Sequence, residues 1–271
     1  ELEHPAEGNL LLRQVRQAGA LVQAFPISPK TSYQMITVEP LEPNTDYEAI
    51  LALRDSKGSY SQPSFLDEPW GSVTFHTQST TEPLHVGVIG DSGFGEPVTA
   101  KLAEQMAAYP LDFVIHTGDL VYQTSENAST AEAFALKYYR PFSPILHHTP
   151  VYAVPGNHEY AKDACVDNQP FYFDVFAPLA DLDQGDQPVT GKRQYYAIVY
   201  QNIQFLFLDS QVFFGEEGKQ EQEDWLKERL QDDRFIYSVV IFHIPPFTSS
   251  LIHPKDSLPV RQDLQPLFAA A

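Results

Sequence analysis

Cysteine is nearly absent from this sequence, and long apolar runs are absent altogether. One cysteine among 271 residues, Cys165, excludes an intrachain disulfide and any zinc-finger framework. The longest apolar stretches, such as residues 238–242, have the length of a β-strand, whereas a helix that spans a bilayer needs roughly 18 apolar residues. The sequence therefore predicts no transmembrane anchor, and it leaves the redox compartment open.

Basic residues are also scarce. The chain has 17 Lys and Arg against 36 Asp and Glu, which gives a formal net charge of -19. Such a surface repels the backbone of nucleic acids and anionic lipids, so the sequence predicts neither nucleic acid nor membrane as a partner. A small anionic substrate would need positive charge fixed at one place, and bound cations are the most direct source of that charge.

Apolar residues are plentiful enough for a core, because 43% of the chain is hydrophobic and its length suits one or two domains. Apolar and polar residues alternate in the first part of the chain, as in 47–54 and 72–77, which favours an all-β sandwich. The segment 41–47 resembles the fibronectin type III pattern, in which a tyrosine turns back on the preceding corner. We expect this domain over residues 1–82, with a strand or two missing before Glu1.

Beyond residue 83 the pattern changes to strands that alternate with helices, which indicates an α/β domain over residues 83–271. The long polar stretch 160–192 is typical of a loop over a site rather than a linker. The expected strands are 84–89, 113–116, 151–154, 195–200, 203–208 and 236–242, and the expected helices are 96–109, 130–139 and 220–230.

Four of the expected strands end in a polar cluster. Because the carboxyl ends of strands in an α/β sheet line the crevice where ligands bind, these clusters can converge although about 150 residues separate the first from the last. The glycine ahead of each acidic or amide residue allows a sharp turn off the strand and leaves room for a ligand. The clusters are Gly90-Asp91-Ser-Gly93, Gly118-Asp119-Leu-Val-Tyr122, Gly156-Asn157-His158-Glu159 and His243 after Val239-Val-Ile-Phe242.

These clusters contain carboxylates, a carboxamide, imidazoles and a phenol, but no thiolate. Oxygen and imidazole ligands of this kind suit hard or borderline cations such as Fe, Mn or Zn. One aspartate can bridge two metals about 3.5–4 Å apart, which is the arrangement that stabilises in-line displacement at phosphorus. The residue types therefore point to two-metal hydrolysis of phosphoesters.

In order and spacing, the four clusters resemble four of the five metal motifs of purple acid phosphatases, within the calcineurin-like metallophosphoesterases. The resemblance covers about residues 84–271 and implies an αββα sandwich, and many members also carry a fibronectin-like domain. Ordinary metallophosphoesterases have a histidine where this chain has Gly93, and the compensating phenol Tyr122 favours the purple acid branch. Supporting strings are Gln222-x-x-Trp225-Leu226, Phe207-Leu208-Asp209-Ser210 and His243-Ile-Pro245-Pro-Phe247.

The resemblance implies a role for each of these residues. Asp91 and Tyr122 would bind Fe(III), Asp119 would bridge to a divalent Fe, Zn or Mn, and that second metal would also take Asn157 and His243. A metal-bound hydroxide would then attack the phosphorus of a small phosphate monoester in line.

The acid in that reaction would be His158, which would donate a proton to the leaving alkoxide, with Glu159 orienting it or adding to the acid role. His253 could reach the substrate from its loop, or could be an ordinary loop residue. The family also implies secretion, and the triplet from Asn127 to Ser129 is a possible glycosylation site in that setting.

The fifth motif of the family, Gly-His-x-His, does not occur before the last residue, Ala271. We expect a chain cut short of its natural end, the alternative being a natural protein with a degenerate site. As given, each metal would lack one imidazole ligand. Two other functions stay open: phosphodiesterase or nucleotidase activity on the same metal core, and a non-catalytic adhesion or binding protein. The sequence does not determine the oligomeric state.

Overall fold

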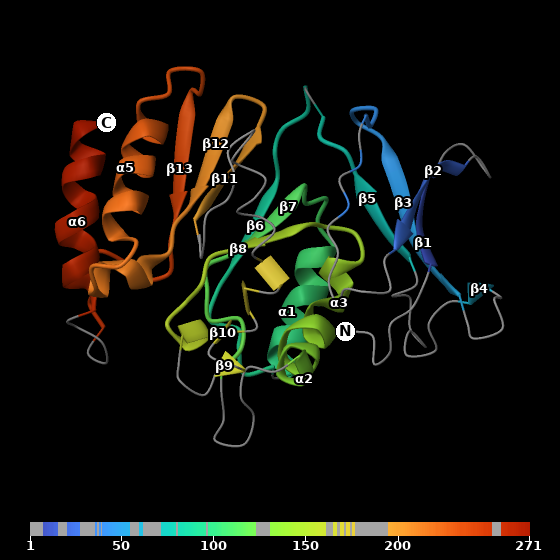
Figure 1. Cartoon of the computed structure of the whole chain (residues 1–271), viewed down its shortest axis with the longest axis horizontal. Helices are drawn as coiled ribbons and strands as arrows, with labels where there is room; N and C mark the ends of the chain where they lie inside the picture. Colours follow the sequence, from blue (N-terminus) through green and yellow to red (C-terminus); the bar gives the residue numbers. More distant parts are fainter. Residues whose placement is uncertain are drawn as a thin grey trace. The chain divides into compact units, whose positions relative to one another are not determined.

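The alternating residues near the N-terminus form an antiparallel sheet in the computed structural model of the chain (Figure 1). Its strands follow the order β2-β1-β3-β4, and β5 pairs with residues 46–50 of β3. The predicted all-β region is therefore confirmed, although the described residues form a single sheet and the fibronectin III identity stays a prediction. The strands are β1 (Gly8–Gln14), β2 (Leu21–Ile27), β3 (Asp46–Arg54), β4 (Tyr60–Ser61) and β5 (Ser72–His76).

The structure describes only part of the chain. It covers residues 8–15, 21–27, 36, 38, 40–54, 60–61, 72–79, 81–95, 97–122, 131–160, 165–166, 169–170, 172–173, 175–176, 195–250 and 256–271. Asn127, His253 and most of the predicted loop 160–192 lie outside these ranges. None of the helices in the described ranges has both the length and the apolar composition that a bilayer crossing needs.

Tyr47 anchors the corner that precedes β3. Its ring is buried, with 1% of its surface exposed, and stacks on Phe75 at 5.6 Å between ring centroids. Its hydroxyl accepts the backbone N–H of Glu42 at 3.0 Å and the side-chain N–H of Gln14 at 3.1 Å. The tyrosine thus turns back on the preceding corner, as the sequence pattern predicts.

A second sheet, with strand order β6-β7-β8, begins the α/β part of the chain. β7 is buried along its whole length because its residues Phe113–His116 are apolar apart from the last. Beyond the predicted helix 130–139 the structure has a further helix, α3, which carries Pro141 in its first turn, where a missing N–H costs little, and Pro144 in its interior. The elements are β6 (Val86–Ile89), α1 (Pro97–Ala107), β7 (Phe113–His116), α2 (Ala131–Phe134), the π-helical turn η1 (Ala135–Tyr139), α3 (Arg140–Leu146) and β8 (Val151–Ala153).

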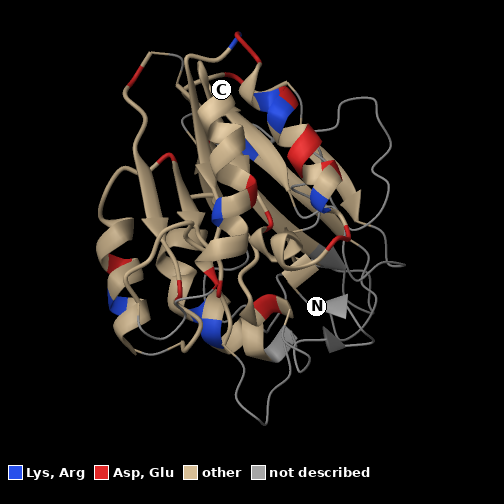
Figure 2. Ribbon diagram, turned by 90° about the vertical axis from the view of Figure 1, so that its left-hand side faces the viewer, with Lys and Arg blue, Asp and Glu red and all other residues tan. Residues whose placement is uncertain are grey.

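A third sheet has the order β11-β12-β13, in which β11 and β12 form the predicted hairpin and β12 and β13 run parallel. Acidic and basic residues both occur along α5 (Figure 2), while Leu226 joins the core beneath the helix. That core consists of Tyr195, Ala197, Leu206, Leu208, Phe213, Leu226, Ile244, Val260 and Leu264. The elements are β11 (Tyr196–Tyr200), β12 (Ile203–Phe207), the short 3-10 helix η4 (Ser210–Phe214), α5 (Lys219–Leu230), β13 (Tyr237–Ile241) and α6 (Ser257–Ala270).

The chain divides into two compact units, one drawn from residues 1–87, 96–114 and 139–151, the other from 88–95, 115–138 and 152–271. Within the first unit, the backbone N–H of Thr74 on β5 donates to the carbonyl of His147 at 3.0 Å. The predicted domain division after residue 82 stays a prediction. Short elements complete the second unit: the 3-10 turn η2 (His158–Tyr160) and the paired strands β9 (Cys165–Val166) and β10 (Gln169–Pro170).

We expect Tyr47→Phe to lower the free energy of unfolding by about 1 kcal/mol, because two donors lose their acceptor while the ring still packs. Urea unfolding of the two proteins measures the difference. Tyr237→Phe, whose ring is 64% exposed, is the matched control and should change little. Equal stability of Tyr47→Phe and wild type would show that the hydroxyl contributes nothing.

Candidate metal centre

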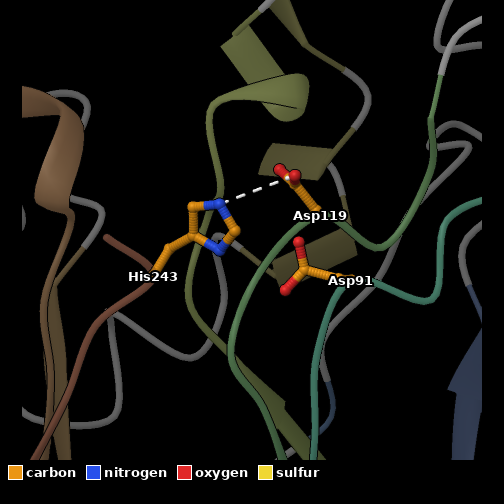
Figure 3. A group of neighbouring side chains, drawn as sticks. All are labelled: Asp91, Asp119 and His243. Atoms are coloured by element: carbon orange, nitrogen blue, oxygen red, sulfur yellow. Dashed lines mark ion pairs between the residues drawn. The ribbon is translucent and has the colours of Figure 1, made fainter. Parts of the chain in front are cut away.

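Loops that follow strands of two different sheets bring three potential metal ligands together (Figure 3). Asp91 comes from the loop after β6, Asp119 from the loop after β7, and His243 from the segment after β13. One ligand atom of each residue lies within 4.8 Å of the other two. Residues about 150 positions apart in the sequence therefore share one site.

The two aspartates occupy unusual backbone conformations. Asp91 has φ 53° and Asp119 has φ 56°, in the left-handed region that residues other than glycine rarely adopt. Such strain persists only where the surrounding structure enforces it, and it is concentrated at functional sites. Here it turns each carboxylate off the end of its strand.

Gly156 is required by close packing against Asp119. A Cβ atom at Gly156 would lie 2.1 Å from the carboxylate Oδ1 of Asp119 and 2.5 Å from its backbone nitrogen. The sequence predicted that this glycine leaves room for a ligand. In the structure the room is filled by the neighbouring loop, so the glycine allows the loops after β7 and β8 to approach each other.

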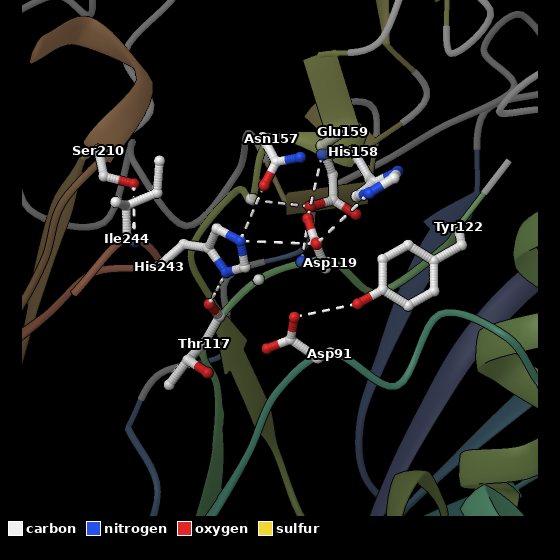
Figure 4. Close-up of polar contacts among 12 residues, drawn as sticks. Asp91, Thr117, Asp119, Tyr122, Asn157, His158, Glu159, Ser210, His243 and Ile244 are labelled. Atoms are coloured by element: carbon white, nitrogen blue, oxygen red, sulfur yellow. Dashed lines mark hydrogen bonds and ion pairs between the residues drawn. The ribbon is translucent and has the colours of Figure 1, made fainter. Parts of the chain in front are cut away.

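Asp119 lies at the centre of the polar contacts (Figure 4). It is buried, and its Oδ1 accepts the backbone N–H of His158 at 3.0 Å. Its Oδ2 lies 3.5 Å from Nε2 of His243 and 3.9 Å from Nε2 of His158. One oxygen is thus held by the backbone, while the other faces the two imidazoles.

His243 is oriented by a backbone carbonyl. Its Nδ1 donates to the carbonyl oxygen of Thr117 at 2.8 Å, which places the proton of the neutral ring on Nδ1. The lone pair of Nε2 then faces Oδ1 of Asn157 at 3.1 Å and Oδ2 of Asp119 at 3.5 Å. Three lone pairs that converge in this way fit a shared cation, and a carbonyl on the second imidazole nitrogen is the usual support of a metal-binding histidine.

Tyr122 joins the site from beside Asp91. Its hydroxyl donates to Oδ1 of Asp91 at 3.0 Å, and its ring packs 4.4 Å from both Phe94 and His158. Burial, followed by the hydrogen bond to Asp91, raises the pKa of the Tyr122 phenol above its ordinary value. A cation next to the oxygen would oppose this shift, so phenolate ligation at this position depends on the metal.

Glu159 is buried beneath the site rather than exposed in it. Its Oε2 accepts the backbone N–H groups of Gly156 at 2.7 Å and Asp119 at 2.9 Å, and its Oε1 accepts that of Leu120 at 2.9 Å. Burial and then the Asp119 carboxylate raise the pKa of Glu159 to about 7, against the opposing effect of these N–H donors. The side chain therefore joins the loops after β7 and β8.

His116 makes a similar connection between the loops after β6 and β7. Its Nδ1 accepts the backbone N–H of Gly118 at 3.3 Å, so Nε2 carries the proton and donates to Oγ of Ser92 at 2.8 Å. Burial, followed by repulsion from His243, lowers the pKa of His116 to about 3, which keeps the ring neutral.

A pocket of about 500 Å³ opens over the site. Of the predicted site residues, six line it, Glu159 does not, and His253 lies outside the described residues. The lining residues are Asp91, Asp119, Tyr122, Asn157, His158, Gln211, Phe214, His243, Ile244, Pro245, Thr248, Ser250, Asp256 and Ser257.

Comparison with known families gives a match over residues 84–266 to the calcineurin-like phosphoesterases. The chain belongs to this family. The fold of the chain is similar to that of purple acid phosphatase PPD1 from yellow lupin (Lupinus luteus) seeds, with a TM-score of 0.66 and 16% sequence identity. The likeness covers 97% of this chain and 51% of the lupin chain, so the sequence spans about half the length of that protein. The comparison with curated proteins found no match.

Family membership supports a phosphoester hydrolase that works on a metal core. The donor set of this chain fits such a core, because carboxylate, carboxamide and imidazole atoms meet at one point and His243 presents an unprotonated nitrogen to it. The predicted α/β metallophosphoesterase fold is thus confirmed. The identity and number of the metals, and the role of each residue, stay predictions.

Asp209 holds the segment that carries the pocket residue Gln211, and sequence reasoning used it only as part of a supporting string. It caps η4, where its Oδ1 accepts the backbone N–H of Gln211 at 2.8 Å, and its Oδ2 accepts the hydroxyl of Tyr160. The side chain of Gln222 pairs with both backbone groups of Asp209, at 2.9 and 3.0 Å. An aspartate directly after an apolar strand is a helix-cap signal that could have identified it.

We expect Glu159→Gln to lower the free energy of unfolding by about 1–3 kcal/mol, because one amide N–H₂ group would face backbone N–H donors instead of accepting from them. Urea unfolding measures this change. Glu228→Gln, on the exposed face of α5, is the control. Equal effects of the two substitutions would show that the carboxylate does not hold the loops.

A pH dependence follows from Asp209. Burial raises the pKa of this carboxyl from 3.8 to about 6, so the folded chain binds the proton more tightly than the unfolded chain does. The stability due to Asp209 is therefore fully present below the ordinary pKa and is lost as pH rises through about 6. We expect Asp209→Asn to gain stability relative to wild type between pH 4 and pH 7.

Urea unfolding at four pH values across this range tests the expectation. Asp233→Asn, an exposed aspartate, is the control and should leave the pH profile of wild type unchanged. A constant difference between Asp209→Asn and wild type at every pH would contradict the assignment.

Proposed function

We propose that the protein hydrolyses phosphate monoesters at two metal ions held by Asp91, Tyr122, Asp119, Asn157 and His243. The observation that carries the proposal is the convergence of Asp91, Asp119 and His243 within 4.8 Å, with Nε2 of His243 turned toward the oxygens of Asp119 and Asn157. Family membership supports phosphoester chemistry at this point.

The metals, when bound, would supply Lewis-acid stabilisation of phosphate charge and a nucleophile from water at moderate pH. The chain supplies their geometry. Asp119 presents one oxygen to the pocket while its other oxygen is held by the N–H of His158, and the carbonyl of Thr117 fixes the ring of His243. The carboxylate of Glu159 keeps both loops in place from below.

The purple acid type is proposed from the pair formed by Tyr122 and Asp91. A hydroxyl that lies 3.0 Å from a carboxylate oxygen can become a phenolate ligand beside that carboxylate, and a phenolate suits Fe(III). Gly93 leaves the space for Tyr122, because a Cβ atom there would lie 2.3 Å from the backbone nitrogen of Tyr122. Fe, Zn or Mn would complete the pair as the divalent ion.

His158 is proposed as the proton donor to the leaving alkoxide. Its side chain is 40% exposed and lines the pocket, and its Nε2 lies 3.9 Å from Oδ2 of Asp119. The ring packs edge-on against Tyr122 with 4.4 Å between ring centroids, which restricts its orientation. A positioned imidazole of this kind contributes about 10²–10⁴-fold to hydrolysis.

Two substitutions separate metal binding from proton donation. We expect Asp119→Asn to reduce bound metal below two ions per chain and to abolish hydrolysis, because the bridging oxygen loses its charge. We expect His158→Ala to keep the metals and to slow hydrolysis of alkyl phosphates about 100-fold, with a smaller effect on p-nitrophenyl phosphate, whose leaving group needs no proton.

Elemental analysis and steady-state kinetics on the full-length protein measure both effects, with the exposed Asp224→Asn as control. Normal activity in Asp119→Asn would overturn the bridging role. A full-length wild type that binds no metal would favour the binding-protein alternative, and preference for diesters would favour the phosphodiesterase alternative.

A further inference from the structure

The pocket is larger than a phosphate group needs, and its lining falls into two parts. One part consists of His158 and the proposed metal ligands, which are Asp91, Asp119, Tyr122, Asn157 and His243. The rest of the lining, which we call the distal wall, consists of Gln211, Phe214, Ile244, Pro245, Thr248, Ser250, Asp256 and Ser257. Pockets of about 300–1,000 Å³ hold organic ligands, so the volume of about 500 Å³ leaves room for the organic part of an ester beside the distal wall.

The distal wall combines neutral hydrogen-bonding groups with one aromatic ring. It offers a carboxamide from Gln211, hydroxyls from Thr248 and Ser257, and the ring of Phe214, which is 48% exposed. Its one charged residue, Asp256, is acidic, and no Lys or Arg occurs among the described lining residues. This chemistry suits a neutral group that carries hydroxyls on one side and C–H surface on the other, and it disfavours a second phosphate.

Gln211 supplies a second, independent observation. Its Nε2 is a buried donor that has no hydrogen-bond acceptor among the residues that the structure describes. Its backbone is held, because its N–H donates to Oδ1 of Asp209 at 2.8 Å within the first turn of η4. A buried donor without an acceptor is destabilising, and rotation of the carboxamide toward a substrate hydroxyl would remove that cost.

We propose that the distal wall binds the organic part of the substrate, and that Gln211 and Phe214 select phosphate esters of neutral, hydroxyl-bearing alcohols such as sugars and polyols. The inference rests on the proposed phosphomonoesterase function and names its substrate class. The carboxamide donates to a hydroxyl of the alcohol, and the ring of Phe214 covers its C–H face.

The experiment compares three esters with the metal-loaded, full-length protein: glucose 6-phosphate, phenyl phosphate, which has no hydroxyl on its leaving group, and fructose 1,6-bisphosphate. We expect Gln211→Leu to lower kcat/KM for glucose 6-phosphate about threefold to tenfold, the range for one neutral hydrogen bond. It should change kcat/KM for phenyl phosphate less than about twofold. Gln220→Leu, on the exposed side of α5, is the matched control.

The wild type should also prefer glucose 6-phosphate to the bisphosphate, because the distal wall offers no described cation to the second phosphate. Suppose that the wild type hydrolyses phenyl phosphate, and that Gln211→Leu lowers kcat/KM equally for both monoesters or for neither. That result would overturn the inference and leave the proposed function standing. Equal wild-type kcat/KM values for the bisphosphate and for glucose 6-phosphate would also overturn the inference. Hydrolysis of none of the three esters would refute the proposed function and the inference with it.

Discussion

The candidate site depends on one buried carboxylate, that of Glu159, which accepts backbone N–H groups from the loops after β7 and β8. Each loop carries a proposed metal ligand, Asp119 in one and Asn157 in the other. The loops can meet only because Gly156 has no side chain, and they stay together only because the orphan N–H groups at the strand ends find an acceptor. Hydrogen bonds from the backbone to Glu159 and close packing at Gly156 therefore hold the loops that carry the proposed ligands.

Electrostatics make such a site depend on cations. Three carboxyl groups, from Asp91, Asp119 and Asp256, line one pocket of a chain whose net charge is -19. An anionic phosphate ester would be repelled from this pocket unless bound cations reversed its charge. The acidic surface is thus compatible with phosphoesterase activity, provided that metals bind where Asp91, Asp119 and His243 meet.

The second unit also shows how the core supports the pocket wall. The parallel pairing of β12 and β13 places Asp209 and Ser210 beside the segment that follows β13, where the N–H of Ile244 donates to Oγ of Ser210 at 3.2 Å. Asp209 caps η4, and η4 presents Gln211 and Phe214 to the pocket. The pairing of β12 with the edge strand β13 thereby determines which side chains line this part of the pocket.

Local sequence pattern was sufficient for most strands, for the hairpin of β11 and β12, and for the polar clusters at the strand ends, since period-two alternation and glycine turns act over a few residues. It failed where distant contacts decide the outcome. The helix past residue 139 continues through Pro141, which is tolerated in the first turn of α3. Glu159 is the last residue of its metal motif, yet only its burial and hydrogen bonds show that it accepts backbone N–H groups instead of facing the pocket.

The sequence by itself determined the residue types of the site, their order along the chain and the family to which they belong, because ligand chemistry and motif spacing are properties of the chain. Only the tertiary structure decided which atoms face one another: the tautomer of His243, the left-handed backbone of Asp91 and Asp119, and the position of Gln211 in the distal wall. The physical reason is that each of these depends on hydrogen bonds and close packing between loops far apart in sequence, which no local pattern records.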